Sequence, residues 1–77
     1  MRLRIIEVNF LKSKDWVFKL SSDELSEVYV MNETFYRKRR MESPITKHEL
    51  DSLDVGHWVN AIVVKMEDVF VVTGLYK

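Results

Sequence analysis

The sequence predicts a small, mainly β-sheet protein with one short helix. Runs of alternating apolar and polar side chains recur along the chain, as is typical of half-buried strands. One segment, residues 47–54, instead has the spacing and the capping residues of a helix. The 77 residues are 47% hydrophobic and include four Phe, three Tyr and two Trp, which suffices for one small core. We therefore expect a single domain over residues 1–77.

The first two strands are predicted at residues 4–11 and 16–20, on either side of a polar turn at 12–15. Side chains alternate between the two faces of a strand, so one face of each run is apolar. Lys19 lies on the opposite face of the second run. The side chains predicted to share an apolar face are Ile6, Val8 and Phe10 in the first strand and Trp16, Phe18 and Leu20 in the second. Because Trp16 and Phe18 share a side with Leu20, we expect both to be core residues.

A third strand is predicted at residues 28–31, with the sequence FYRKRRM at 35–41 as its extended continuation. Residues 32–34 between them suit a turn or a bulge. Ser43-Pro44 would end the extended segment, because proline cannot donate to a sheet ladder.

The helix predicted at 47–54 precedes two further strands. Thr46 and Glu49 have capping-box spacing, Leu50 and Leu53 lie on one helical face, and Gly56 follows as a stop signal. Residues 57–66 and 69–76 read as strands joined by Glu67-Asp68. We expect a hairpin there, with a loop that can exceed two residues because Glu-Asp is a poor tight turn.

The resulting order, β-β-β-α-β-β, resembles that of the OB-fold, a five-stranded Greek-key barrel. The passage ELDSLDVGHWVNAIVV carries the likeness, with a short apolar helix, a glycine and then a strand rich in aromatic and β-branched residues. The resemblance is one of layout and no specific family signature is present. An SH3-like barrel is the nearest alternative, followed by an α+β sheet with the helix on one face.

Composition argues against several functional classes. The chain has no Cys and only two Gly, so neither a thiol nucleophile nor a glycine-rich phosphate loop is present. His48, Asp51 and His57 are too few for a structural zinc site, which normally has four Cys/His ligands. We expect no enzyme, metal, cofactor or small-molecule substrate. We also expect a cytoplasmic protein, because no signal peptide or membrane-spanning run is present.

The strongest functional signal is the basic and aromatic segment within FYRKRRM. OB-folds bind oligonucleotides across strands two and three, with bases on aromatic rings and phosphates on Lys and Arg. In an extended strand Tyr36, Lys38 and Arg40 would share one face, while Phe35, Arg37 and Arg39 would face the other way. The predicted site for single-stranded nucleic acid comprises Tyr36, Arg37, Lys38, Arg39, Arg40 and Lys19.

Two other interpretations of these cations remain open. Residues 1–40 hold nine Lys/Arg against six Asp/Glu, net +3, and residues 41–77 hold three against six, net −3. The cluster can therefore be a solvated strand edge, a common guard against aggregation, or can pair with acidic residues of the second half. It can also meet an acidic protein surface.

The alternative function is protein interaction, through apolar residues of the last two strands. Both faces of 57–66 are apolar, and only one of them can line a barrel. The other face would be covered by a second copy, as a homodimer, or by a partner, such as a host protein bound by a small phage or bacterial protein. The residues predicted for this surface are Trp58, Ile62, Val64 and Phe70.

Overall fold

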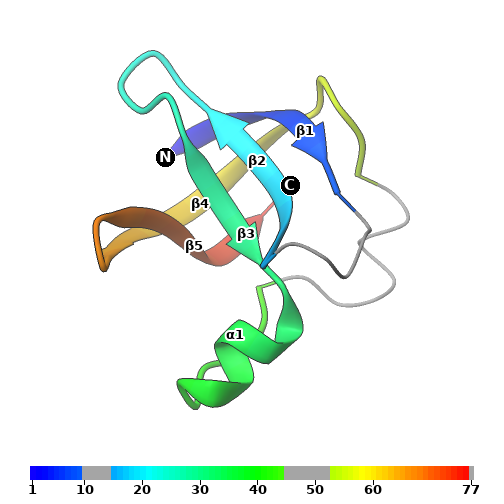
Figure 1. Cartoon of the computed structure of the whole chain (residues 1–77). Helices are drawn as coiled ribbons and strands as arrows, with labels where there is room; N and C mark the ends of the chain where they lie inside the picture. The colour runs from blue at the N-terminus through cyan, green and yellow to red at the C-terminus, as the bar shows by residue number, and fades with distance from the viewer. Residues whose placement is uncertain (10–14, 45–52, 77) are drawn as a thin grey trace.

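The computed structural model describes residues 1–9, 15–44 and 53–76, which form a mainly β-sheet globule with one short helix (Figure 1). The fold class predicted from the sequence is confirmed. In the described residues the elements follow the order β-β-β-α-β-β. The elements are β1 (Arg2–Val8), β2 (Trp16–Ser21), β3 (Val28–Met31), α1 (Glu33–Lys38), β4 (Trp58–Met66) and β5 (Val69–Tyr76).

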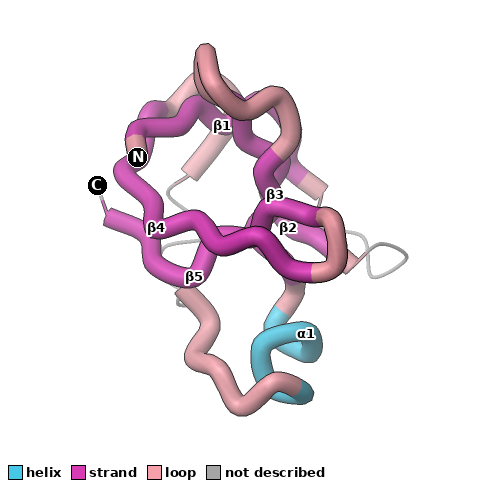
Figure 2. The backbone as a smooth tube through the Cα atoms, turned by 90° about the vertical axis from the view of Figure 1, so that its left-hand side faces the viewer, coloured by secondary structure: helices cyan, strands magenta, loops and turns pink. Residues whose placement is uncertain are grey.

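The five strands form one sheet that closes in a ring, in the order β1-β2-β3-β5-β4 (Figure 2). β1 pairs antiparallel with both β2 and β4, and β2 pairs antiparallel with β3. The fourth strand thus returns beside the first, which is a Greek-key arrangement. β5 closes the ring by pairing antiparallel with β4 and parallel with β3. Both views place α1 at one end of the ring.

The core fills the interior of the ring. Leu3, Ile5, Phe18, Leu20 and Val72 are each at most 1% exposed, because alternate residues of every strand point inward. Burying a side chain of this size contributes about 1.5–3 kcal/mol of transfer free energy. Residues from all five strands contribute to this cluster, so the core holds the ring together from every side.

The segment FYRKRRM is not an extended strand, and this prediction was wrong. Residues 33–38 form α1, which begins at the N-cap Asn32. The Asn32 side chain accepts a hydrogen bond from the Phe35 amide at 3.0 Å, and Glu33 supplies negative charge in the first turn. The Asn32 cap and the acidic Glu33 therefore favour a helix here, although the aromatic residues that follow indicated a strand.

The helix predicted at 47–54 falls mostly on residues 45–52, which lie outside the described residues. Leu53 and Asp54 are described and are not helical, while Leu53 is buried in the core. Gly56 has φ +94°, a left-handed value that glycine adopts without strain, and its amide donates to Ile5 O.

Two bulges change which residues face the core. The register of β1 against β2 slips between Ile5 and Glu7, so Leu3 and Ile5 point inward while Ile6 is 40% exposed. The prediction that Ile6 and Val8 share one face was therefore wrong, because Ile6 is exposed while Val8 packs against the core. Phe10 lies outside the described residues.

The second bulge lies between Trp16 and Phe18, where β2 slips against β3. Phe18 and Leu20 are buried as predicted. Val17 is the extra residue of this bulge, so the inward–outward alternation reverses across it. Trp16 therefore pairs with Met31 on the outer side of the sheet. Assigning Trp16 to the core was thus wrong.

The β4–β5 hairpin is confirmed, with the two-residue turn Glu67-Asp68. Both residues have positive φ, 49° and 69°, as a type I′ turn requires. The loop is as short as a hairpin allows, despite the unfavourable residue types, because a type I′ turn matches the twist of two long paired strands.

Candidate functional site

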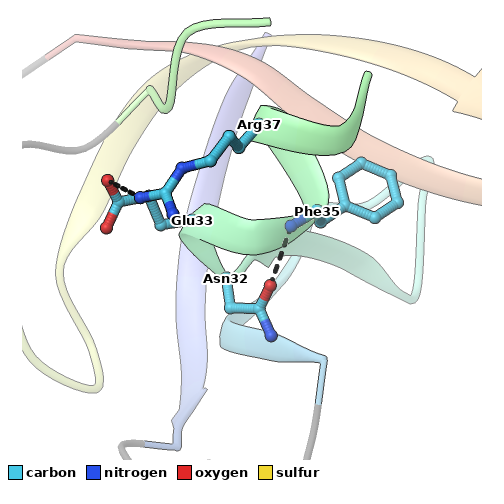
Figure 3. A network of polar contacts seen from close by, with 4 residues as sticks. All are labelled: Asn32, Glu33, Phe35 and Arg37. Atoms are coloured by element: carbon cyan, nitrogen blue, oxygen red, sulfur yellow. Dashed lines mark hydrogen bonds and ion pairs between the residues drawn. The ribbon is translucent and has the colours of Figure 1, made fainter. Parts of the chain in front are cut away.

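The basic residues of the predicted site lie on α1 and on the turn that follows it. Figure 3 shows Arg37 reaching back to Glu33, with Nη2 2.9 Å from the carboxylate, while the Phe35 ring points away from this pair. Arg39 lies over the Phe35 ring, its guanidinium carbon 3.7 Å from the centroid, and its Nη2 is 3.7 Å from the Glu67 carboxylate. Arg39 thus has an acidic partner in the second half of the chain, as one interpretation of the sequence predicted, whereas Arg37 pairs with its neighbour Glu33 in the first half.

The end of α1 places Arg40 in an uncommon backbone conformation. The Met41 amide donates to Tyr36 O at 2.9 Å, and the Arg40 amide donates to Arg37 O at 3.1 Å. This pair of bonds is a Schellman motif, with Arg40 at the left-handed position and φ 55°. Glycine is the favoured residue there, since other residues strain the backbone.

Lys38 and Arg40 are exposed, and neither forms an ion pair with another described residue. Lys19 lies on β2, away from α1 in sequence, and its amino group is 3.3 Å from the Glu27 carboxylate. The hydrogen bond to Glu27 raises the pKa of Lys19. Of the six predicted site residues, only Lys38 and Arg40 are therefore without a described acidic or core partner.

Tyr36 is not a stacking surface, because the side chain is fully buried. Its hydroxyl donates to Val72 O at 2.6 Å and accepts from the Met31 amide at 3.1 Å. Burial raises the pKa of Tyr36 to about 12. Placing Tyr36 beside Lys38 and Arg40 on one exposed face was wrong, because the helix turns the phenol inward while the two cations stay in solvent.

An aromatic surface that the sequence reasoning missed lies on the outer face of β2 and β3. The rings of Trp16 and Tyr29 are half-buried, with centroids 5.5 Å apart and planes inclined at 52°. Lys19 pairs with Tyr29 across the two strands, and Met31 pairs with Trp16. The alternation of 28–31 is the signal that could have placed Tyr29 on the outer face, whereas the bulge that turns Trp16 outward leaves no clear signal in the sequence.

A hollow of about 190 Å³ lies between the end of β3 and α1, next to the Trp16–Tyr29 pair but not lined by it. Met31 forms its wall on the β3 side, Phe35 and Arg39 form the wall on the helix side, and Asp15 and Glu67 also line it. Val71, which pairs with Tyr29 across the parallel strands, completes the floor. The outer face of β2 and β3 is therefore continuous with the helix that carries the basic residues.

The other end of the same face is acidic. A second hollow, of about 380 Å³, lies beside Tyr29. Its lining includes Glu24, Glu27 and Asp68 and, among the described residues, no Lys or Arg, so this end of the face is acidic, whereas the hollow at α1 has Arg39 beside Glu67 and Asp15. No group of three His, Asp or Glu in the described part of the chain is placed to hold a metal ion.

A second outer surface is formed by β1, β4 and the end of β5, and it adjoins the first where Val64 pairs with Val71. We call it the β4 face, and its residues are Arg2, Arg4, Trp58, Ile62, Val64 and Tyr76. Trp58, Ile62 and Tyr76 are 52%, 52% and 58% exposed, and Val64 is 40% exposed. The predicted exposure of three of these β4 and β5 positions, Trp58, Ile62 and Val64, agrees with the structure.

Phe70 does not belong to this surface. It is half-buried, pairs with the buried Val28, and packs against the core cluster. Including Phe70 in an outer partner surface was therefore wrong, because β5 alternates so that Phe70 and Val72 both point inward.

Comparison with known proteins gives no family assignment. No protein-family model, curated protein or solved structure matches the chain. Among the described residues, no helix has the length and apolar character needed to cross a membrane.

Proposed function

We propose that this protein is a small non-enzymatic binding module with an OB-fold-like barrel, which binds single-stranded nucleic acid across the outer face of β2 and β3. The Greek-key strand order and the helix between β3 and β4 support the OB-like arrangement. In that fold, strands two and three carry oligonucleotides. The proposal rests chiefly on one observation, the outward-facing Trp16–Tyr29 pair on those two strands, continuous with the basic end of α1.

The two parts of this surface would recognise different parts of the ligand. All four bases can stack on aromatic side chains, so stacking tolerates any nucleotide sequence. The half-buried rings of Trp16 and Tyr29 suit this role. Phosphates are attracted to cations that are not already neutralised, and Lys38 and Arg40 have no described acidic partner. Recognition through rings and charge implies little base specificity.

The acidic hollow beside Tyr29 limits the path of the strand. Glu24, Glu27 and Asp68 would repel phosphates at that end of the face. The bound strand would therefore run from α1 over Trp16 and Tyr29 and no further. We expect a short site of about four nucleotides, at the low end of the range for a single OB-fold.

Fluorescence anisotropy with labelled dT20 and rU20 tests the proposal. The chain has two Trp, so Trp16→Ala and Trp58→Ala form a matched pair, one on each outer surface. We expect Trp16→Ala to weaken binding about 5- to 150-fold, equivalent to the roughly 1–3 kcal/mol of one stacked base. Trp58→Ala should bind like the unchanged protein.

Salt dependence provides the second readout. Each phosphate contact contributes about −0.7 to the slope of log K against log salt for single strands. Replacing Lys38 and Arg40 together by Ser should reduce the magnitude of that slope by about 1.4. Absence of binding at low salt, or equal binding by Trp16→Ala and the unchanged protein, would overturn the proposal.

A further inference from the structure

We propose that the β4 face is a docking surface for a protein segment whose apolar side chains are flanked by carboxylates. This inference does not depend on nucleic-acid binding, because the β4 face and the Trp16–Tyr29 pair lie on different strand pairs of the ring.

The apolar part of the β4 face is continuous across two strands. Ile62 pairs with Gly74, and a Cβ added at Gly74 would lie 3.0 Å from Ile62 Cδ1. Ile62 therefore leans over the bare backbone of β5. Tyr76 lies beside Asn60, two pairs further along and so on the same side of the sheet, and Ile62 and Tyr76 therefore border a shared surface rather than two isolated patches.

The charged part is basic. Arg4 pairs with Trp58 across β1 and β4, and the Arg2 guanidinium carbon lies 5.3 Å from the centre of the Trp58 ring. Within the described residues neither arginine forms an ion pair. Asp23 and Glu24 share a hollow with Arg2 but make no ion pair with it. A partner that is complementary to this surface would present apolar side chains with carboxylates beside them.

The residue types favour a protein over a polyanion. Trp, Tyr and Arg are the side chains most enriched at energetically dominant positions of protein interfaces. Ile62 and Val64 extend the surface with aliphatic groups that offer no ring for a base to stack on. A flat aromatic and aliphatic surface next to two arginines therefore fits a mixed apolar and acidic peptide.

A second copy of the chain fits less well. A two-fold interface places the same patch on both sides, so the β4 face of one copy brings two more arginines and no carboxylate to Arg2 and Arg4 of the other. Like charges in such a contact oppose association. Charge complementarity thus selects an acidic partner instead of a homodimer.

Selection from a displayed library of random 12-residue peptides on the immobilised full chain tests this inference, with the Trp58→Ala chain as counter-selection. We expect selected peptides that combine Asp or Glu with large apolar residues. Synthetic copies should bind at least 10-fold more weakly to Trp58→Ala, Ile62→Ser and Arg2→Glu. Val55→Ser, at an apolar residue 54% exposed outside the β4 face, serves as the matched control and should bind normally.

A charge exchange sharpens the test. Replacing the acidic residues of a selected peptide by Lys should restore binding to Arg2→Glu and abolish binding to the unchanged chain. Selected peptides without carboxylates, or with equal affinity for Trp58→Ala, would overturn the inference. Displacement of the peptide by dT20 would favour nucleic acid, and a dimer that Ile62→Ser dissociates would favour a second copy; either result also overturns it.

Discussion

The Tyr36 hydroxyl stands where the parallel pairing of β3 and β5 ends. Val28 pairs with Phe70 and Tyr29 pairs with Val71, so the next ladder bond would join the Met31 amide to Val72 O. The phenol occupies that place, accepting from Met31 at 3.1 Å and donating to Val72 at 2.6 Å. One side chain of α1 thus extends the ladder and attaches the helix to the ring.

We predict that Tyr36→Phe lowers the free energy of unfolding by about 1–3 kcal/mol, because the Met31 amide and Val72 O lose their partner. Urea unfolding followed by circular dichroism measures this change.

The pH dependence of stability adds a second signature of the Tyr36 hydroxyl. The pKa of about 12 in the folded protein lies above the ordinary value of 10, so burial favours the neutral phenol.

The stabilisation from neutral Tyr36 is therefore complete below pH 10 and is lost as the pH rises toward 12. Over that interval the unchanged protein should lose roughly 2–3 kcal/mol more stability than Tyr36→Phe. The absorbance difference at 295 nm between the two proteins isolates the ionisation of this phenol. Equal stability profiles for both proteins from pH 9 to 12 would contradict the role assigned to the hydroxyl.

At Arg40 the backbone conformation favours glycine, whereas the proposed contact with phosphate requires a cationic side chain. Its left-handed φ of 55° suits glycine, yet the position carries an exposed cation. We predict that Arg40→Gly raises the free energy of unfolding by about 0.5–1 kcal/mol and weakens binding of dT20. Thermal unfolding and anisotropy on the same sample measure the two effects. A loss of stability, or unchanged affinity, would contradict this assignment.

At the scale of the elements, the strands could be predicted from alternation but the bulges could not. A single inserted residue, Val17, moves Trp16 from the interior to the outer face, and in β1 the inserted residue is Ile6 itself. Bulges arise from the pairing of two strands, so one strand's sequence does not reveal them. The candidate site was mislocated for this reason, because its aromatic half depends on the bulge at Val17.

The helix α1 was missed because aromatic and basic residues read equally well as strand or helix over six residues. The signals that do identify it are Asn32 as N-cap, Glu33 in the first turn, and cations in the last turn. These signals outweigh the β-propensity of Phe35 and Tyr36. The helix presents the cations of this segment at one end of the ring instead of along a strand.

The β4–β5 turn provides a prediction at the element scale. Asp68 has φ 69°, which costs a non-glycine residue about 1–2 kcal/mol, partly offset by the greater freedom of glycine in the unfolded chain. We predict that Asp68→Gly raises the free energy of unfolding by about 0.5–1 kcal/mol. Asp23→Gly, at an exposed residue without positive φ, is the matched control and should not stabilise. Chemical unfolding of both variants decides whether the turn is strained.

At the scale of the whole molecule, the closed ring leaves two outer surfaces of different character. The face of β2 and β3 carries the Trp16–Tyr29 pair and meets the basic end of α1. The β4 face carries exposed Trp58, Ile62 and Tyr76 beside two arginines. The five strands could be predicted because each run is short and strongly patterned, but the helix of the observed order is α1 at 33–38 and not the segment predicted at 47–54. The closure of the ring depends on pairings between β1 and β4 and between β3 and β5, which join distant residues.

The most direct test of nucleic-acid binding uses the two Trp indole N–H signals in a ¹H–¹⁵N NMR spectrum, assigned with Trp16→Phe and Trp58→Phe. Titration with dT8 and with rU8 reports on both outer surfaces in the same sample. We predict that the Trp16 indole signal shifts on titration while the Trp58 signal stays in place. A shift of the Trp58 signal alone, or of neither signal at millimolar oligonucleotide, would contradict the account.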